Sequence, residues 1–233
     1  MIVMPANATG WFWHCLARET GRIGHLYSPG AQRGPWPWFP FALDNGAFSC
    51  WDMQHNIFDH DKWDSVEPAW KQLIRWAAPT GLAKWAIVPD VIGDMEETFV
   101  KWDKWYRFVC DSEITPALAV QDGMEPEDVR ALDNIPSIIC VGGTTEWKWE
   151  TVEKWKANFK RVHVLRCNSP EKLHYLEALG IESCDGTGWN RGDRKQTEGL
   201  ENWARLKPEP KLFSLTPHVC RKAKQGQAEL FAI

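Results

Sequence analysis

Long apolar runs are missing from this sequence of 233 residues. None approaches the roughly 20 consecutive apolar residues that a membrane-spanning helix needs. The first residues, Met1-Ile2-Val3-Met4-Pro5, also lack the basic region and apolar core of a secretory signal. We therefore expect a cytoplasmic protein with no membrane partner.

Paired cysteines are missing as well. The seven cysteines are scattered without a Cys-x-x-Cys pair. An odd, dispersed set indicates neither a disulfide framework nor a thiolate zinc site, and several of these cysteines stand in apolar runs, where a thiol behaves as a small hydrophobe. The sequence predicts no metal ion and no cofactor.

Several catalytic signatures are absent. There is no phosphate-cradling P-loop, no Rossmann glycine fingerprint and no His-Glu-x-x-His. This excludes P-loop nucleotide hydrolysis, dinucleotide redox chemistry and zincin proteolysis. The net charge of −4 argues against a protein that coats nucleic acid through bulk electrostatics, although a local basic surface could still hold a phosphate backbone.

What the sequence does contain is a regular alternation of strand-like and helix-like segments. The composition, 25% charged and 44% hydrophobic, is that of one globular domain over residues 1–233. Strands that are apolar on both faces, each followed by a helix, predict a parallel sheet covered by helices, and seven or eight such units favour a closed (β/α)8 barrel. The expected strands lie within Gly24–Gly30, Phe41–Asp44, Lys84–Asp90, Pro116–Gln121, Ser137–Gly143, Arg161–Arg166, Ile181–Cys184 and Leu212–Leu215. The expected helices span about Asp61–Trp76, Met95–Val109, Pro126–Leu132, Thr144–Phe159, a segment ending at Leu179-Gly180, and Glu198–Leu206.

Two segments contain residues that favour turns and loops. Asn45-Gly46 is a hairpin signal taken alone, but the helical periodicity that follows favours strand, loop and helix. The segment Gly34–Pro40 contains three prolines and is a rigid loop. It could stack on a base or cover hydrophobic surface. The 16 tryptophans recur mostly at helical spacing, as in Trp63 and Trp70, which is typical of core packing.

In a parallel barrel the active site forms from the loops that follow the strands. The acid Asp185 stands at such a strand end, in the glycine-rich turn Asp185-Gly186-Thr187-Gly188. It could cap the next helix or form an Asx-turn. Because other strand ends repeat the pattern, we interpret Asp185 as the nucleophile. Acids and an amide with closely approaching backbone suit a purine pocket; the strand ends carry Asp44, Asp90, Gln121, Gly142, Gly143, Arg166 and Asp185.

These motifs resemble those of the tRNA-guanine transglycosylases, in particular the divergent branch that inserts 7-deazaguanine bases into DNA in bacterial and phage modification systems. Asp44–Ser49 resembles the family's Asp-Ser-Gly-Gly-Phe-Gln, and Val120–Gly123 resembles its Val-Gln-Gly. Val141–Gly143 resembles its Gly-Gly loop, and Gly180–Asp185 resembles the segment that bears its nucleophile. The order of the motifs agrees, and the resemblance spans about residues 40–190.

The resemblance implies base exchange by double displacement. Asp185 would attack C1′ of a guanosine nucleotide, and Asp44 would act as acid and base. A nucleotide in a duplex would first have to be extruded. The resemblance further implies that Asp90, Gln121 and the backbone at Gly142 and Gly143 hold the base.

The sequence also departs from the family. Only His218 and Cys220 remain where tRNA-acting members carry a zinc site, too few for a tetrahedral site. This favours DNA over tRNA as the substrate. The family's Pro-Thr-Arg after the nucleophile is absent, but Arg191, Arg194 and Lys195 follow Asp185 and could contact phosphates. Arg166 could bind phosphate or the base, or it could pair with a strand-end acid.

Three functions stay open at this stage. The first is a transglycosylase that replaces guanine in DNA with a queuosine-related base such as 7-cyano-7-deazaguanine. The second is a hydrolase that uses the same carboxylates with water to release the base. The third is a binding protein that sequesters a nucleobase or nucleotide, for example as a phage counter-defence factor. The resemblance also implies a homodimer, and a phage origin would place the protein in the host cytoplasm.

Overall fold

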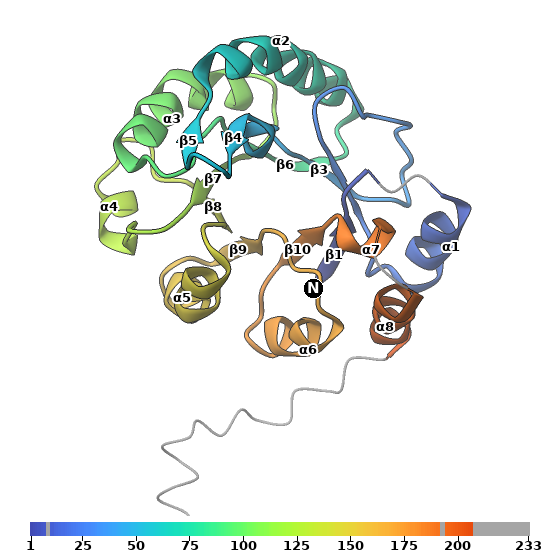
Figure 1. The fold of residues 1–233 in the computed structure, drawn as a ribbon. Coiled ribbons are helices and arrows are strands. Elements are labelled where there is room, and N and C mark those ends of the chain that lie inside the picture. The colour runs from blue at the N-terminus through green and yellow to red at the C-terminus, as the bar shows by residue number, and fades with distance from the viewer. Residues whose placement is uncertain (8–9, 192–193, 207–233) are drawn as a thin grey trace, which may run out of the picture.

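The computed structural model describes residues 1–7, 10–191 and 194–206. Eight parallel strands in the order β1-β10-β9-β8-β7-β6-β3-β2 alternate with helices in a single-domain (β/α)8 barrel of the TIM type (Figure 1). Two parallel bridges, Val3 to Ile23 and Ala6 to Leu26, join β1 to β2 and bring the ends of the sheet together. The barrel strands are β1 (Ile2–Pro5), β2 (His25–Tyr27), β3 (Phe41–Leu43), β6 (Ala83–Ile87), β7 (Pro116–Val120), β8 (Ile138–Val141), β9 (Arg161–Val164) and β10 (Ser183–Gly186).

The helices surround the strands, as the ribbon shows (Figure 1). Three of them start at a capping side chain: Asp59, Asp94 and Thr144 each accept a hydrogen bond from a backbone N–H in the first turn. None of the described helices is long and apolar enough to cross a membrane. The helices are α1 (Trp11–Thr20), α2 (His60–Ala77), α3 (Met95–Cys110), α4 (Pro126–Arg130), α5 (Thr145–Asn158), α6 (Pro170–Ala178), α7 (Gly188–Arg191) and α8 (Arg194–Arg205), with 3-10 turns η1 (Ala47–Cys50) and η2 (Ala78–Thr80).

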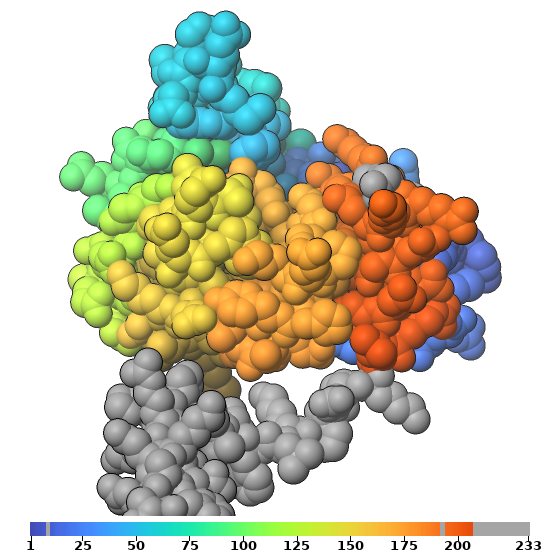
Figure 2. Space-filling model, turned by 60° about the horizontal axis from the view of Figure 1, so that its bottom comes forward, coloured from blue at the N-terminus to red at the C-terminus, as the bar shows by residue number. Residues whose placement is uncertain are grey.

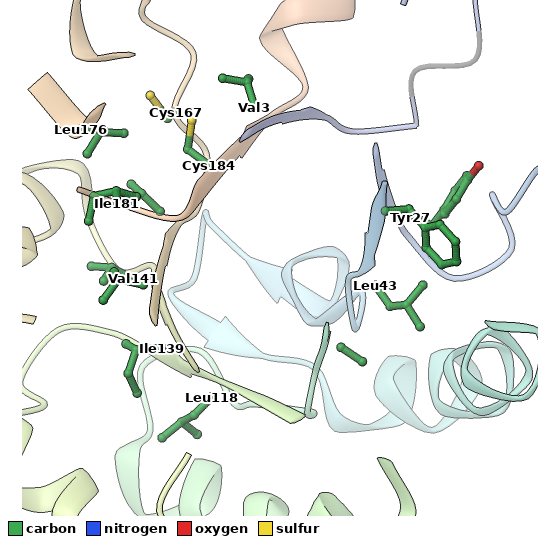
Figure 3. Packing of buried hydrophobic residues seen from close by; sticks show 14 of the residues in the cluster. Val3, Tyr27, Leu43, Leu118, Ile139, Val141, Cys167, Leu176, Ile181 and Cys184 are labelled. Carbon is green, nitrogen blue, oxygen red and sulfur yellow. The ribbon is translucent and has the colours of Figure 1, made fainter. Parts of the chain in front are cut away.

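Alternation along each strand builds two apolar layers. Leu118 and Ile139 point outward from their strands into the layer under the helices, as Val141 does (Figure 3). Alternate residues such as Ala119 and Cys140 point inward and fill the barrel. Among the tryptophans at helical spacing, Trp70 and Trp102 are fully buried in the outer layer, whereas Trp63 packs in a separate cluster with Cys50 and Phe58.

Two parts of the fold were not predicted from the sequence. The chain begins with a barrel strand, β1, before the strand expected within Gly24–Gly30. Asn45-Gly46 does not form a hairpin turn, but an antiparallel hairpin of β4 (Trp51–Asp52) and β5 (Ile57–Phe58) follows η1 and precedes α2. These ladders are only two residues long and carry little periodicity of their own. The strand expected at Leu212–Leu215, together with His218 and Cys220, lies outside the described residues.

Candidate active site

A cavity of about 520 Å³ opens at the carboxyl ends of the barrel strands. This size falls within the range of roughly 300 to 1,000 Å³ that is usual for small-molecule sites. The strand-end residues named from the sequence meet in its lining, because parallel strands end at one mouth. The cavity lining includes Asp44, Asp90, Gln121, Gly142, Gly143, Arg166 and Asp185.

Asp185 lies on β10 with its side chain directed inward and only 5% exposed. Its Oδ1 atom is 3.0 Å from the backbone nitrogen of Arg166, which donates to it, and 3.1 Å from Nε2 of His163. The turn after Asp185 is tight: a Cβ on Gly186 would lie 2.7 Å from the carbonyl oxygen of Cys167. The glycine therefore allows the β9 and β10 ends to approach each other behind the carboxylate.

Asp44 follows β3 and lies half-buried in the same cavity lining. The hydroxyl of Ser28, which follows β2, donates to its Oδ2 atom at 3.1 Å. Burial raises the pKa of the Asp44 carboxyl above its ordinary value, and the negative charge of Asp185 raises it further. Asp44 is therefore suited to carry a proton beside a second carboxylate.

Asp90 follows β6 and is 8% exposed. Burial raises the pKa of its carboxyl from 3.8 to about 6, the charge of Asp44 adds to this increase, and a hydrogen bond from Asn45 opposes it. The Asn45 amide donates to Asp90 Oδ1 at 2.7 Å and to the Val88 carbonyl at 3.0 Å. Asp90 is thus held in place and takes up a proton below about pH 6.

Gln121 lines the cavity, but its amide is engaged with the loop that carries Asp90. Its Oε1 atom accepts from the Gly93 N–H at 2.8 Å, and its Nε2 atom donates to the Val91 carbonyl at 2.8 Å. The side chain therefore fixes the β6–α3 loop in the structure described here. A base could still donate to the second lone pair of Oε1, whereas binding through Nε2 would require this atom to exchange a contact.

The Gly-Gly turn after β8 is closely surrounded. The Gly142 N–H donates to the Val120 carbonyl at 2.8 Å, so it belongs to the sheet ladder. Gly143 has a φ of 71°, and a Cβ there would lie 2.4 Å from Oδ2 of Asp122. Only glycine fits this turn without displacing the Asp122 side chain, which caps α5 through Thr144.

The side chain of Arg166 does not pair with a strand-end acid, one of the two roles considered from the sequence. Its guanidinium donates to the Gly143 carbonyl and lies 4.8 Å from the ring centroid of Phe48 at the mouth of the cavity. Its contact with a strand-end acid is made by the backbone N–H, which reaches Asp185. The residue has a φ of 55°, a conformation that costs a non-glycine residue free energy and aims this N–H at the carboxylate.

Arg191, Arg194 and Lys195 do not line the cavity. All three are exposed on α7 and α8, the helices that follow β10. Arg194 pairs with Glu198 one turn further along α8. The basic residues therefore form part of the surface beyond Asp185 and are not part of the pocket itself.

One side of the cavity mouth is formed by η1 and the β4–β5 hairpin. Phe48, Trp51, Met53 and Asn56 from this segment line the cavity. The segment projects beyond the barrel in the space-filling view, where it is light blue (Figure 2). Met53 is 75% exposed at this rim.

The proline-rich loop Gly34–Pro40 lies away from the cavity. No residue of Gly34–Pro40 lines the cavity. Trp36 packs at 4.4 Å from the ring of His14, and Phe39 is buried. The loop covers hydrophobic surface, and the base-stacking interpretation is wrong for the cavity found here.

Sequence reasoning missed two buried polar residues near Asp185. His163, in the middle of β9, is fully buried and contacts both Ser183 and Asp185. Lys148 on α5 is 2% exposed, and its amine donates to the Leu165 carbonyl at 2.8 Å. Burial lowers the pKa of Lys148. Alternation along β9 could have placed His163 inside the barrel, on the face opposite Val162 and Val164, but not its contact with Asp185.

The described residues contain no group of three or more histidine, cysteine, aspartate or glutamate side chains placed to hold a metal ion. The site is instead a set of carboxylates that line one cavity and differ in their surroundings. No protein-family model matches the chain, and no curated protein matches it. The fold and the cavity therefore define a TIM-type barrel with its candidate site at the usual end of the barrel.

Proposed function

We propose that the protein is a pentosyltransferase that replaces guanine in DNA with a 7-deazaguanine base, such as 7-cyano-7-deazaguanine, by double displacement. The observation that carries the proposal is the pair of carboxylates, Asp44 and Asp185, in one cavity. The pKa of Asp44 is raised by burial and by the charge of Asp185. Such a pair divides the roles of proton carrier and nucleophile between two like side chains.

The proposed first displacement begins with attack of the Asp185 carboxylate on C1′ of the nucleotide. The C1′–N9 bond breaks, its electron pair goes to the purine, and Asp44 gives that purine a proton. In the second displacement the incoming base loses a ring proton to Asp44 and its nitrogen attacks C1′. Asp185 leaves as a carboxylate, so configuration at C1′ is retained after two inversions.

The rest of the cavity supports binding of a purine. Asp90, protonated below about pH 6 and ionised above it, can exchange hydrogen bonds with a base edge. Ile87 and Ala119 supply apolar walls, and the Arg166 guanidinium over Phe48 stands at the mouth. The exposed Arg191, Arg194 and Lys195 are available for contacts with a phosphate backbone.

The test measures incorporation and a covalent adduct in parallel. Wild-type protein, Asp185→Asn and Asp44→Asn are incubated with single-stranded DNA, duplex DNA and tRNA, with labelled guanine or 7-cyano-7-deazaguanine. We expect label in DNA and a denaturation-resistant protein–DNA adduct that requires Asp185. Asp103→Asn, an exposed carboxylate on α3, is the matched control and should behave as wild type.

Other products would identify another function. Release of free guanine without incorporation would indicate the hydrolase, which uses water in place of the incoming base. Tight binding of guanine by wild type and Asp185→Asn, with neither label nor free base, would indicate a sequestering protein. Label in tRNA alone would retain the chemistry and overturn the DNA substrate.

A further inference from the structure

A chain of hydrogen bonds runs under the cavity from β9 to β10. Ser183 Oγ lies 2.8 Å from Nδ1 of His163, and Nε2 of His163 lies 3.1 Å from Oδ1 of Asp185. His163 is 0% exposed, and its ring centroid is 4.6 Å from that of Trp85 inside the barrel. The imidazole is therefore fixed by packing on its face and by contacts at both nitrogens.

The chemistry of Asp185 and Ser183 determines which atom donates in each of these two hydrogen bonds. An ionised carboxylate has only acceptor atoms, so the proton between His163 and Asp185 belongs to Nε2. A neutral imidazole then has its lone pair on Nδ1, and the Ser183 hydroxyl must donate to it. Asp185 thus selects the tautomer in which His163 donates to it, and Ser183 supports this tautomer by donating to Nδ1.

Both donors to Asp185 reach the same oxygen atom. The His163 Nε2–H and the Arg166 backbone N–H converge on Oδ1, and no hydrogen bond to Oδ2 is found within residues 1–7, 10–191 and 194–206. We propose that His163 is a positioning residue that holds Oδ1, so that Oδ2 is the attacking oxygen, and that it stabilises the Asp185 carboxylate when this group leaves. The inference rests on the proposed function.

If His163 acts in this way, its loss should affect the two displacements to different extents. In the first, the Oδ2–C1′ bond forms while the C1′–N9 bond breaks, and Oδ1 becomes the carbonyl oxygen of an ester. In the second, the C1′–Oδ2 bond breaks and its electron pair restores the carboxylate. Hydrogen bonds to a carboxylate are stronger than those to a carbonyl, so the donors favour the second displacement.

The experiment separates the two displacements in single-turnover kinetics. Adduct is formed on guanine-containing DNA without incoming base, and its decay is followed after 7-cyano-7-deazaguanine is added in excess. For His163→Leu we expect adduct decay to slow by roughly ten- to hundredfold, the effect of removing a hydrogen bond to a charged group. Adduct formation should slow less, so the adduct accumulates. His163→Gln, which can place an N–H near the position of Nε2, should recover part of the rate of decay.

A second measurement, of the protonation of His163, does not depend on catalysis, and a second variant, Ser183→Ala, is a milder change. Nitrogen NMR of the wild-type protein should show His163 with its proton on Nε2. In Ser183→Ala, which removes only a hydroxyl, we expect a mixture of tautomers and slower adduct decay. A proton on Nδ1 in the wild type would overturn the proposal, as would unchanged adduct decay in His163→Leu. If the wild type forms no adduct, the proposed function fails, together with the role of His163 in it, whatever tautomer is found.

Discussion

Replacement of Asp90 by asparagine should make the protein more stable at alkaline pH and leave its stability at acid pH unchanged. Asp90 is 8% exposed, and burial raises its pKa from 3.8 to about 6. Between these two values the folded protein binds more protons than the unfolded chain. The free energy of unfolding therefore decreases as pH rises through this window.

The size of the effect follows from the two pKa values. The difference between 3.8 and about 6 corresponds to about 3 kcal/mol, lost completely once the pH exceeds the folded-state value. In Asp90→Asn the side chain keeps its shape and stays neutral, and its oxygen can still accept from Asn45. We therefore expect the variant to exceed the wild type by about 3 kcal/mol at pH 8 and to match it near pH 4.

Urea unfolding followed by tryptophan fluorescence at both pH values measures this difference. Asp103→Asn is the control, because its exposed carboxylate should give no pH-dependent gain. An advantage of Asp90→Asn that is equal at pH 4 and pH 8 would refute the reasoning, since a gain from packing does not titrate. A loss of stability at pH 8 would show that the charged form of Asp90 is favoured by the fold.

Two further predictions concern other residues. His25 is fully buried, its ring nitrogens have no hydrogen-bond partner among the described residues, and burial lowers its pKa from 6.5 to about 3. Stability present above pH 6.5 should therefore be lost as pH falls toward 3, by about 4 kcal/mol, and His25→Phe should unfold with a weaker acid dependence in the same urea assay. Arg166→Gly keeps the N–H that donates to Asp185 and relieves the φ of 55°, so its melting temperature should equal or exceed that of wild type. Under the proposed function, a rise in the KM for DNA without a change in kcat would assign substrate binding to the guanidinium, whereas a fall in kcat with KM unchanged would contradict this.

The strand ends could be predicted from the sequence because they depend on local patterns. Apolar runs stop at Asp44, Asp90 and Asp185, and parallel strands bring such ends to one mouth. This argument needs no knowledge of side-chain packing. The structure confirms the barrel, and the predicted acids lie in the lining of one cavity.

The remaining features depend on contacts between distant segments. His163 stands within Arg161–Val164, a segment that is typical of an ordinary strand, and its contact with Asp185 becomes visible only when β9 pairs with β10. The amide of Gln121 is engaged by Val91 and Gly93, 30 and 28 residues away in sequence. The burial of Lys148 could not be predicted, because helix periodicity does not reveal which carbonyl groups meet a lysine beneath the helix.

The strand order has a consequence for how a nucleotide would lie in the cavity under the proposed function. Asp44 and Asp90 follow β3 and β6, which are neighbours, whereas β10, which carries Asp185, is separated from β6 by three strands on one side. The charge of Asp185 acts on Asp44, and that of Asp44 acts on Asp90. A ligand that contacts both Asp185 and Asp90 must therefore extend across the mouth. Under the proposed function, a nucleoside would do so with C1′ at Asp185, the base edge toward Asp90 and the glycosidic nitrogen near Asp44. The positions of these three acids thus favour a role for Asp44 in moving the proton and for Asp90 in selecting the base.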